Sequence, residues 1–183
     1  MNKIAHYLQE HLLGEVTASP EVRQRFAHDA SILHLAPAVV VYPRDENDVR
    51  KSVRFAWQLA ERGKPLAITA RGYGSGTAGA AIGSGLLMVF TAHMNKIEQF
   101  NPKKRTVVLQ PGISYEVLQA ILSSHKLFLP AYPGNSTHSS IGAGIATNAV
   151  GEKSVKYGPT GGFVQSLRVV LSNGEVIETG PCS

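Results

Sequence analysis

Apolar residues at helical spacing predict three helices in about the first third of the chain. The first spans residues 3–13, and the second begins with Pro20 in its first turn. The third is the clearest, over DENDVRKSVRFAWQLAERG at residues 45–63, where Asp45 can cap the N-terminus and Gly63 ends the helix. The apolar positions that define the buried faces are Ile4, Leu8 and Leu12 in the first helix and Val49, Val53, Ala56, Trp57 and Ala60 in the third.

Three short apolar runs before and after the third helix predict strands. They are AVVVYP at residues 38–43, PLAITA at 65–70 and LLMVF at 86–90. The order strand, helix, strand is that of a right-handed βαβ unit, in which ligands bind at the carboxyl ends of the strands. The second of these strands runs directly into a glycine-rich loop, so we expect a ligand there.

The pattern changes after residue 93. KIEQFNPKKRTVVLQPG, residues 96–112, predicts two short strands across a turn, and a helix follows from Ser114. SLRVVLSNGEVIETG alternates apolar and polar positions around Asn173-Gly174, the strongest short hairpin signal. These patterns predict an α+β protein with an N-terminal helical segment at residues 1–28, a first α/β subdomain at 29–93 and a second α+β subdomain at 94–183.

Two segments rich in small residues and poor in charge separate these elements. ARGYGSGTAGAAIGSGLL, residues 70–87, holds six glycines between Gly72 and Gly85, and Arg71 is its one charged residue. Its spacing matches neither the GxxxxGKS/T phosphate loop nor the GxGxxG dinucleotide fingerprint. Backbone N–H groups can still form an anion-binding nest, because glycine lets the backbone approach phosphate oxygens closely. With the hydroxyl-bearing segment at residues 131–151, the loop predicts one elongated polar ligand between two lobes.

Composition and charge narrow the classes of partner. The formal net charge of +5 suits an anionic ligand, but the basic residues are scattered with few aromatics between them, which argues against nucleic-acid binding. The single cysteine, Cys182, allows no internal disulfide, and the histidines lack metal-binding spacing, so we expect no metal. The apolar runs are too short to span a bilayer, and the start of the chain lacks the features of a signal peptide. We expect a cytoplasmic protein with at most peripheral membrane contact.

Four motifs, in order, resemble one family. ITARGYGSGTAG is similar to the pyrophosphate loop of the vanillyl-alcohol oxidase / para-cresol methylhydroxylase (PCMH) type of FAD-binding domain, which usually carries an R-G-G-G-T-S-like stretch after a strand. PGNSTHSSIGAGIATNAVGEKSVKYG resembles the second flavin segment of that family. LAPAVVVYPRDENDVRKSVRFAWQ resembles its opening strand and helix, and LRVVLSNGEVIETG its following hairpin. The resemblance runs from about residue 29 to 180 and implies a PCMH-type FAD-binding domain made of two α/β subdomains.

The resemblance implies FAD-binding positions in both segments. The backbone from Arg71 to Thr77 would wrap the pyrophosphate, and residues 134–140 would line the middle of the cofactor. Several residues between 141 and 150 would follow the ribityl chain and the flavin ring. At Gly74 we expect a positive φ or a closely approaching phosphate. The implied cofactor-binding residues are Arg71, Gly72, Tyr73, Gly74, Ser75, Gly76, Thr77, Gly134, Asn135, Ser136, Thr137, His138, Ser139, Ser140, Ile141, Gly142, Gly144, Thr147, Asn148, Ala149 and Val150.

The sequence departs from the family pattern at several of these positions. Tyr73 and Val150 stand where glycines are common, and Gly76 stands where a serine is common. Members that attach flavin covalently through this loop carry a histidine near the position of Ser75, so its absence implies non-covalent FAD. Gly79 lies just beyond the motif, and we expect a side chain there to cost little.

The same resemblance implies a class of reaction. The flavin would accept a hydride from a C–H bond that bears a hydroxyl group, and the protein would orient the reactants. NAVGEKSVKYG looks most like the D-lactate and glycolate dehydrogenase branch, which implies an FAD-linked oxidase or dehydrogenase that acts on a small hydroxy acid. The family's cap domain, which supplies most substrate-binding and catalytic residues, has no counterpart here. We therefore expect an N-terminal fragment of a longer protein, or a chain whose remaining part is a separate polypeptide, in either case incomplete for turnover by itself. We assign no catalytic residue and no electron acceptor.

Two alternatives stay open at this point. The chain could be an FAD-binding fragment without activity of its own, which acts as a scaffold or sensor. It could also belong to an alcohol or sugar-lactone oxidase of the same superfamily.

Overall fold

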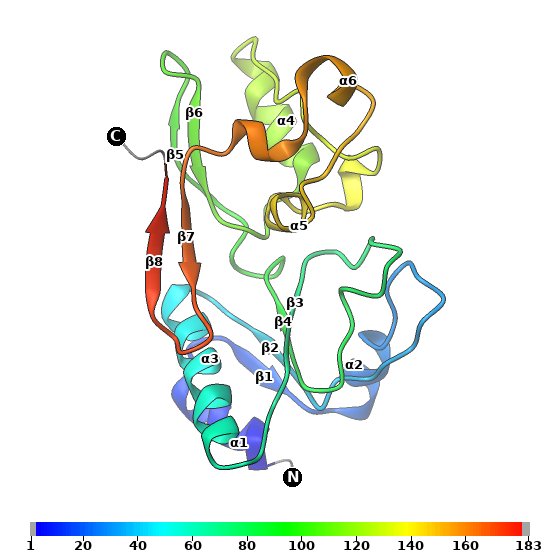
Figure 1. Ribbon diagram of the computed structural model, residues 1–183, viewed down its shortest axis with the longest axis vertical. Helices are drawn as coiled ribbons and strands as arrows, with labels where there is room; N and C mark the ends of the chain where they lie inside the picture. The colour runs from blue at the N-terminus through cyan, green and yellow to red at the C-terminus, as the bar shows by residue number, and fades with distance from the viewer. Residues whose placement is uncertain (1–2, 181–183) are drawn as a thin grey trace.

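The computed structural model describes residues 3–180, and Cys182 lies outside this range. The lower lobe in Figure 1 is built on a four-stranded sheet. Strand β1 is antiparallel to β2, and both β2 and β3 are parallel to β4, which lies between them. The predicted strand–helix–strand order is present, but β2 and β3 are not neighbours. The strands are β1 (Glu15–Thr17), β2 (Val39–Tyr42), β3 (Ile68–Arg71) and β4 (Leu86–Val89).

Three helices of this lobe occur where the apolar spacing predicts them. They are α1 (Lys3–His11), α2 (Pro20–Arg25) and α3 (Glu46–Glu61). Asp45 caps α3 by accepting a hydrogen bond from the backbone N–H of Asp48 at 2.9 Å. The main core between helices and sheet is formed by Leu8, Leu12, Val39, Val41, Val49, Leu86, Met88 and Met94.

Asp48 is a buried carboxylate that ties this lobe together. Its side chain is 0% exposed, and its oxygens accept hydrogen bonds from the backbone N–H groups of Leu13, Gly14 and Arg44 at 2.9, 2.9 and 3.0 Å. These donors lie in the α1–β1 connection and in the turn before α3. A buried charge is tolerated when hydrogen bonds replace its hydration. Asp48 therefore fixes the entry to β1 against the start of α3.

The upper lobe packs a hairpin and short helices around a second core. The hairpin pairs β5 (Ile97–Asn101) with β6 (Thr106–Leu109), as the sequence predicts. Helix α4 (Tyr115–Ser124) begins after its cap Ser114, also as predicted. The other elements are η1 (Ser136–His138), α5 (Ile141–Ala146), α6 (Ser154–Tyr157) and η2 (Thr160–Phe163). The buried residues of this core are Ile113, Tyr115, Leu118, Leu122 and Ile141.

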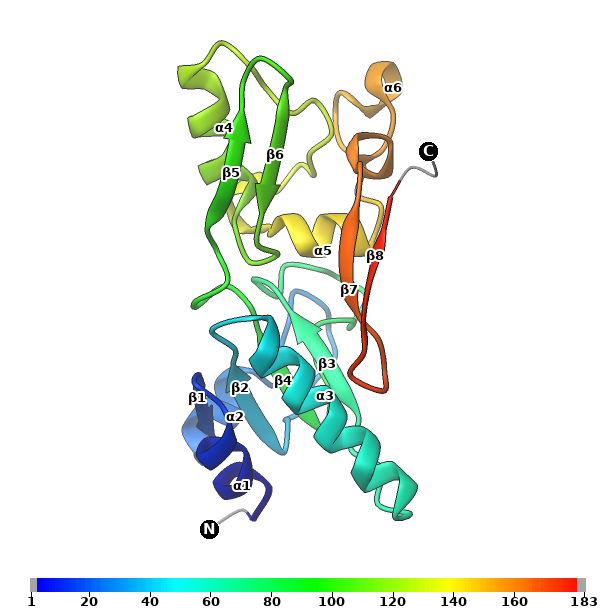
Figure 2. The same cartoon turned by 90° about the vertical axis from the view of Figure 1, so that its left-hand side faces the viewer.

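The last hairpin runs back along the lower lobe. Strand β7 (Leu167–Val170) pairs with β8 (Val176–Thr179), and Gly174 in the turn has a φ of 82°. Figures 1 and 2 both place this hairpin beside α3, where Arg168 makes two hydrogen bonds of 2.9 Å to Glu46. The predicted hairpin is thus confirmed. The predicted division at residues 28–29 and 93–94 stays a prediction.

Candidate functional site

The glycine loop leaves the carboxyl end of β3 and returns to β4 without forming a helix. Five of its six glycines are required by the protein's own packing. A Cβ on Gly72 would overlap Ser140, and Cβ atoms on Gly83 and Gly85 would overlap Thr69 and the carbonyl of Ala67. Gly74 and Gly79 have φ values of 72° and 73°, and their Cβ positions are taken by Arg71 and Leu33, respectively.

Gly76 is the remaining glycine, and it differs from the other five. No atom lies within 4 Å of the position of its Cβ, and its φ is outside the left-handed region. The fold therefore does not explain the absence of a side chain at Gly76. The expectation of a positive φ at Gly74 is confirmed, whereas the expectation that Gly79 tolerates a side chain is wrong, because both its φ and Leu33 oppose one.

Arg71 lies beneath the loop rather than on its outer surface. The residue is 8% exposed, and its Nη1 donates a 2.8 Å hydrogen bond to the carbonyl of Ala81. The guanidinium carbon lies 5.2 Å from the ring centroid of Phe26, a cation–π contact. Burial lowers the pKa of Arg71, and the nearby Asp29 charge opposes that change. The guanidinium stays charged, and it joins the two ends of the loop.

The two glycine-containing segments meet at the start of α5. Gly72 packs against Ser140 and Ala143, and the hydroxyl oxygens of Ser75 and Ser139 are 3.4 Å apart. Ser140 is buried and caps α5 by accepting a 3.4 Å hydrogen bond from the N–H of Ala143. Predicted site residues from the two lobes thus lie side by side.

Glycines in α5 let this helix pack closely against the segment before α4 and against the first residue of α4. A Cβ on Gly142 would overlap Pro111, and a Cβ on Gly144 would overlap the Tyr115 side chain. The N–H of Gly142 also donates a 2.8 Å hydrogen bond to the carbonyl of Pro111. Tyr115 is 0% exposed, and burial raises the pKa of its phenol. Close packing within the protein accounts for these two glycines, while Gly134, like Gly76, has open space at its Cβ position.

The other predicted residues of the second segment lie on both sides of α5. Thr147 ends the helix, and Asn148 follows with a φ of 47° and accepts a 2.8 Å hydrogen bond from the N–H of Gly161. The carbonyl of Ala149 accepts a 2.8 Å hydrogen bond from the Thr160 hydroxyl. Residues predicted before the helix are Asn135, Ser136, Thr137 and His138, which form η1 and its cap.

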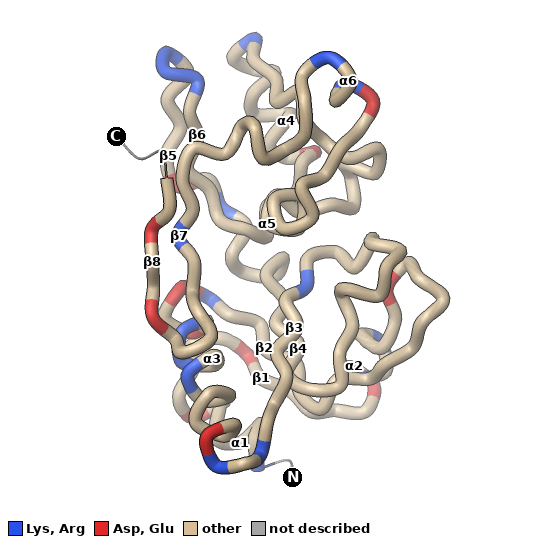
Figure 3. The backbone as a smooth tube through the Cα atoms, viewed as in Figure 1, with Lys and Arg blue, Asp and Glu red and all other residues tan. Residues whose placement is uncertain are grey.

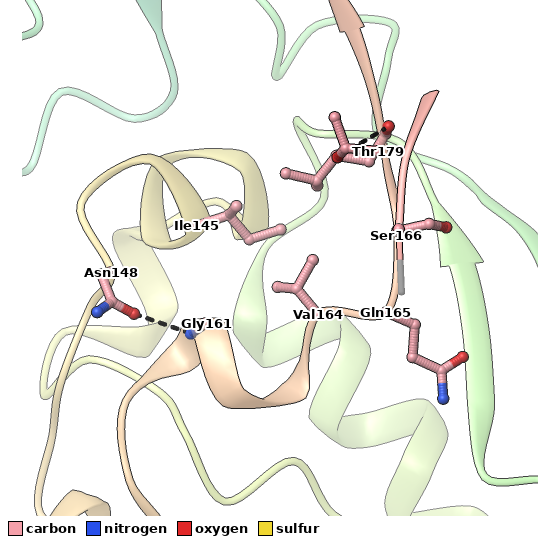
Figure 4. A pocket seen from close by; sticks show the side chains of 9 residues that line it. Ile145, Asn148, Gly161, Val164, Gln165, Ser166 and Thr179 are labelled. Carbon is pink, nitrogen blue, oxygen red and sulfur yellow. Dashed lines mark hydrogen bonds between the residues drawn. The ribbon is translucent and has the colours of Figure 1, made fainter. Parts of the chain in front are cut away.

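An open groove of about 720 Å³ lies beside Asn148, between α5, η2 and the β7–β8 hairpin (Figure 4). Its lining combines Ile145, Val164 and Leu167 with polar residues that include Gln165. Of the predicted site residues, Asn148 alone lines it. Tyr73 and Val150, two of the departures from the family pattern, are 43% and 64% exposed outside the groove.

The residues at the meeting of the two segments are compatible with FAD in their charge and in their exposed backbone. Residues 72–92 and 127–151 contain no Lys, Arg, Asp or Glu, so neither segment brings a carboxylate that would repel a pyrophosphate (Figure 3). The open Cβ positions of Gly76 and Gly134 leave bare backbone exposed to a ligand. Within residues 3–180, no group of three or more His, Cys, Asp or Glu could hold a metal ion, and no helix is both long and apolar enough to cross a bilayer.

This chain belongs to the FAD binding domain family, whose model matches residues 37–180. The predicted family and the predicted cofactor, FAD, are thereby confirmed. The chain is 33% identical to D-2-hydroxyglutarate dehydrogenase of Escherichia coli (strain K12) over 181 residues, which are 99% of the chain and 18% of that protein. It is 32% identical to glycolate oxidase subunit GlcD of Bacillus subtilis (strain 168), across 85% of the chain and 32% of the relative.

Solved structures confirm the predicted α+β fold of PCMH type. An alkyldihydroxyacetonephosphate synthase superposes with a TM-score of 0.82 at 22% identity, covering 98% of this chain and 36% of its own. A 6-hydroxy-D-nicotine oxidase from Arthrobacter nicotinovorans gives 0.78 at 22% identity, covering 92% and 36%. The chain thus spans about a fifth to about a third of the length of these proteins.

No pattern in the sequence indicates which residues support the glycine loop. Phe26, Asp29 and Leu33 precede the region that the family model matches, and no motif contains them. Pro111 and Tyr115, on which α5 rests, read as ordinary turn and helix residues. Their roles follow from contacts that only the folded chain creates.

Proposed function

We propose that this chain is the FAD-binding portion of a flavin-dependent oxidoreductase that oxidises a small 2-hydroxy acid. Its membership in the FAD binding domain family and its relatives that include D-2-hydroxyglutarate dehydrogenases and a glycolate oxidase subunit support this function. The structural observation that carries it is the meeting of the loop with the start of α5, where Gly76 has no packing reason to lack a side chain. A cytoplasmic location with at most peripheral membrane contact belongs to the same proposal.

In this proposal the protein binds and orients, and the bound flavin supplies the capacity to accept a hydride. The backbone of residues 72–77 holds the pyrophosphate through N–H groups, because this loop brings no cationic side chain to its outer face. Residues 134–140 and 141–150 hold the rest of the cofactor. The FAD is non-covalent, since Ser75 stands where a linking histidine would be needed.

The test of the function uses the gene product in which this chain occurs, purified with its FAD. Under anaerobic conditions it is mixed separately with D-2-hydroxyglutarate, D-lactate and glycolate, and the visible absorption of oxidised flavin is recorded. We expect at least one of these acids to bleach the flavin, because hydride transfer reduces it. A protein that binds FAD but is bleached by none of them contradicts the hydroxy-acid function and favours a scaffold, a sensor or an alcohol or sugar-lactone oxidase.

A further inference from the structure

A segment that precedes the first parallel strand holds the glycine loop from its inner side. The N–H of Ala30 donates a 3.0 Å hydrogen bond to the carbonyl of Gly74. Leu33 occupies the space where a Cβ on Gly79 would lie. The ring of Phe26 makes a cation–π contact with the Arg71 guanidinium. These supporting residues precede residues 37–180, which the family model matches.

Arg71 and Asp29 join this segment to the loop electrostatically. Oδ1 of Asp29 accepts a 2.9 Å hydrogen bond from the N–H of Ser31, and Oδ2 is buried without a hydrogen bond within residues 3–180. Burial by itself raises the pKa of Asp29, but interactions with Ser31 and with the backbone of Ala81, and to a smaller extent the Arg71 charge, lower it below its ordinary value. A buried carboxylate oxygen with no hydrogen bond needs a nearby positive charge. Arg71 supplies that charge and also bonds the far end of the loop at Ala81.

The two sides of the loop therefore differ. Its inner side is fixed by the Ala30 hydrogen bond, by Leu33 and by the buried Arg71 side chain. Its outer side, at Gly76, is open. A loop that already has its bound conformation loses less conformational entropy when a ligand binds.

We infer that residues 26–33 and Arg71 form a positioning device that presets the glycine loop for the FAD pyrophosphate. Arg71 acts on the cofactor through the loop backbone, as a positioning residue, and not as a direct phosphate ligand. The part of this inference that concerns FAD rests on the proposed site, whereas the part that concerns loop order applies to the protein without FAD.

The first test compares two identical substitutions, Phe26→Leu and Phe100→Leu. Both rings are partly buried, but Phe100 packs in the second core against His125, away from the loop. We measure the FAD dissociation constant by flavin fluorescence, and amide hydrogen exchange over residues 72–81 in the protein without FAD. Phe26→Leu should weaken FAD binding about three- to tenfold and speed exchange in the loop, because the cation–π contact with Arg71 is lost. Phe100→Leu should change neither the FAD dissociation constant nor the amide exchange over residues 72–81.

A second variant, Asp29→Asn, tests the same device without removing a ring. It should also weaken FAD binding and speed exchange over residues 72–81. Unchanged exchange in both Phe26→Leu and Asp29→Asn overturns the inference. If the wild-type protein binds no FAD but the exchange results are as expected, the proposed site fails and the positioning of the loop stands.

The role of Arg71 is tested by the salt dependence of FAD binding in Arg71→Met. A guanidinium in direct contact with phosphate is screened by salt, so its removal would flatten the dependence of the dissociation constant on salt concentration. A positioning residue leaves that dependence as in the wild type while the affinity falls. Flattening of the salt dependence therefore overturns the positioning role.

Discussion

At the scale of single residues, some glycines of the loop are required by the fold, whereas one is left for contact with a ligand. Gly72, Gly74 and Gly79 lack side chains because Ser140, Arg71 and Leu33 occupy the space. A side chain introduced at any of these three glycines would therefore disturb the fold whether or not the protein binds a cofactor. Gly76 has neither a neighbour nor a left-handed φ, so its bare backbone is free to serve a ligand.

Gly76→Val is therefore a substitution that should affect binding and not folding. We expect an unchanged free energy of unfolding, measured with urea, and FAD affinity lower by about tenfold or more, because the side chain would hold phosphate oxygens away from backbone donors. Gly162→Val is the matched control, since Gly162 also has open space and an ordinary φ but lies outside the predicted site. Equal FAD affinity in both variants would show that no cofactor lies against Gly76.

At the scale of elements, Asp48 and α5 show how caps, close packing and buried hydrogen bonds hold short segments in position. Residues 141–146 contain two glycines and have weak helix propensity, yet they form α5. The Ser140 cap and the close seating on Pro111 and Tyr115 stabilise this helix. In the lower lobe, three backbone donors converge on the buried Asp48 carboxylate and hold the chain between α1 and α3.

Asp48→Asn should destabilise the protein by about 2–3 kcal/mol, because it replaces a charged acceptor of backbone N–H groups with an amide that presents its own donor. Urea unfolding measures this change. Asp45→Asn is the control at the other end of the same turn, because Asn and Asp are comparable N-cap residues. Similar losses of stability in the two variants would contradict the role of Asp48 as the buried anchor.

At the scale of the whole molecule, the sequence was most informative where local patterns decide the structure. The helix over residues 45–63, the strand at 38–43 and the Asn173-Gly174 hairpin depend on periodicity, caps and turn chemistry within a few residues. The placement of β4 between β2 and β3, and the short strand β1, depend on pairing between distant segments.

The candidate site likewise has a part that the sequence predicts and a part that it does not. Its two segments could be identified from their composition and from the family motif, and the structure brings them together at Gly72 and Ser140. The contacts of Arg71 with Phe26 and Ala81 could not be predicted, because nothing in the local sequence indicates a buried guanidinium. The same holds for Gly142 and Gly144, whose small size suits close packing and ligand contact equally well in a sequence.

The measurement that tests the central claim most directly is a calorimetric titration of the purified chain with FAD, FMN and riboflavin. If the glycine loop and the start of α5 hold a pyrophosphate, FAD binds much more tightly than FMN, and FMN and riboflavin bind with similar, weak affinity, because only FAD carries the pyrophosphate. Circular dichroism on the same sample establishes that the chain is folded. FMN that binds as tightly as FAD, or a folded chain that binds no flavin, would contradict the account.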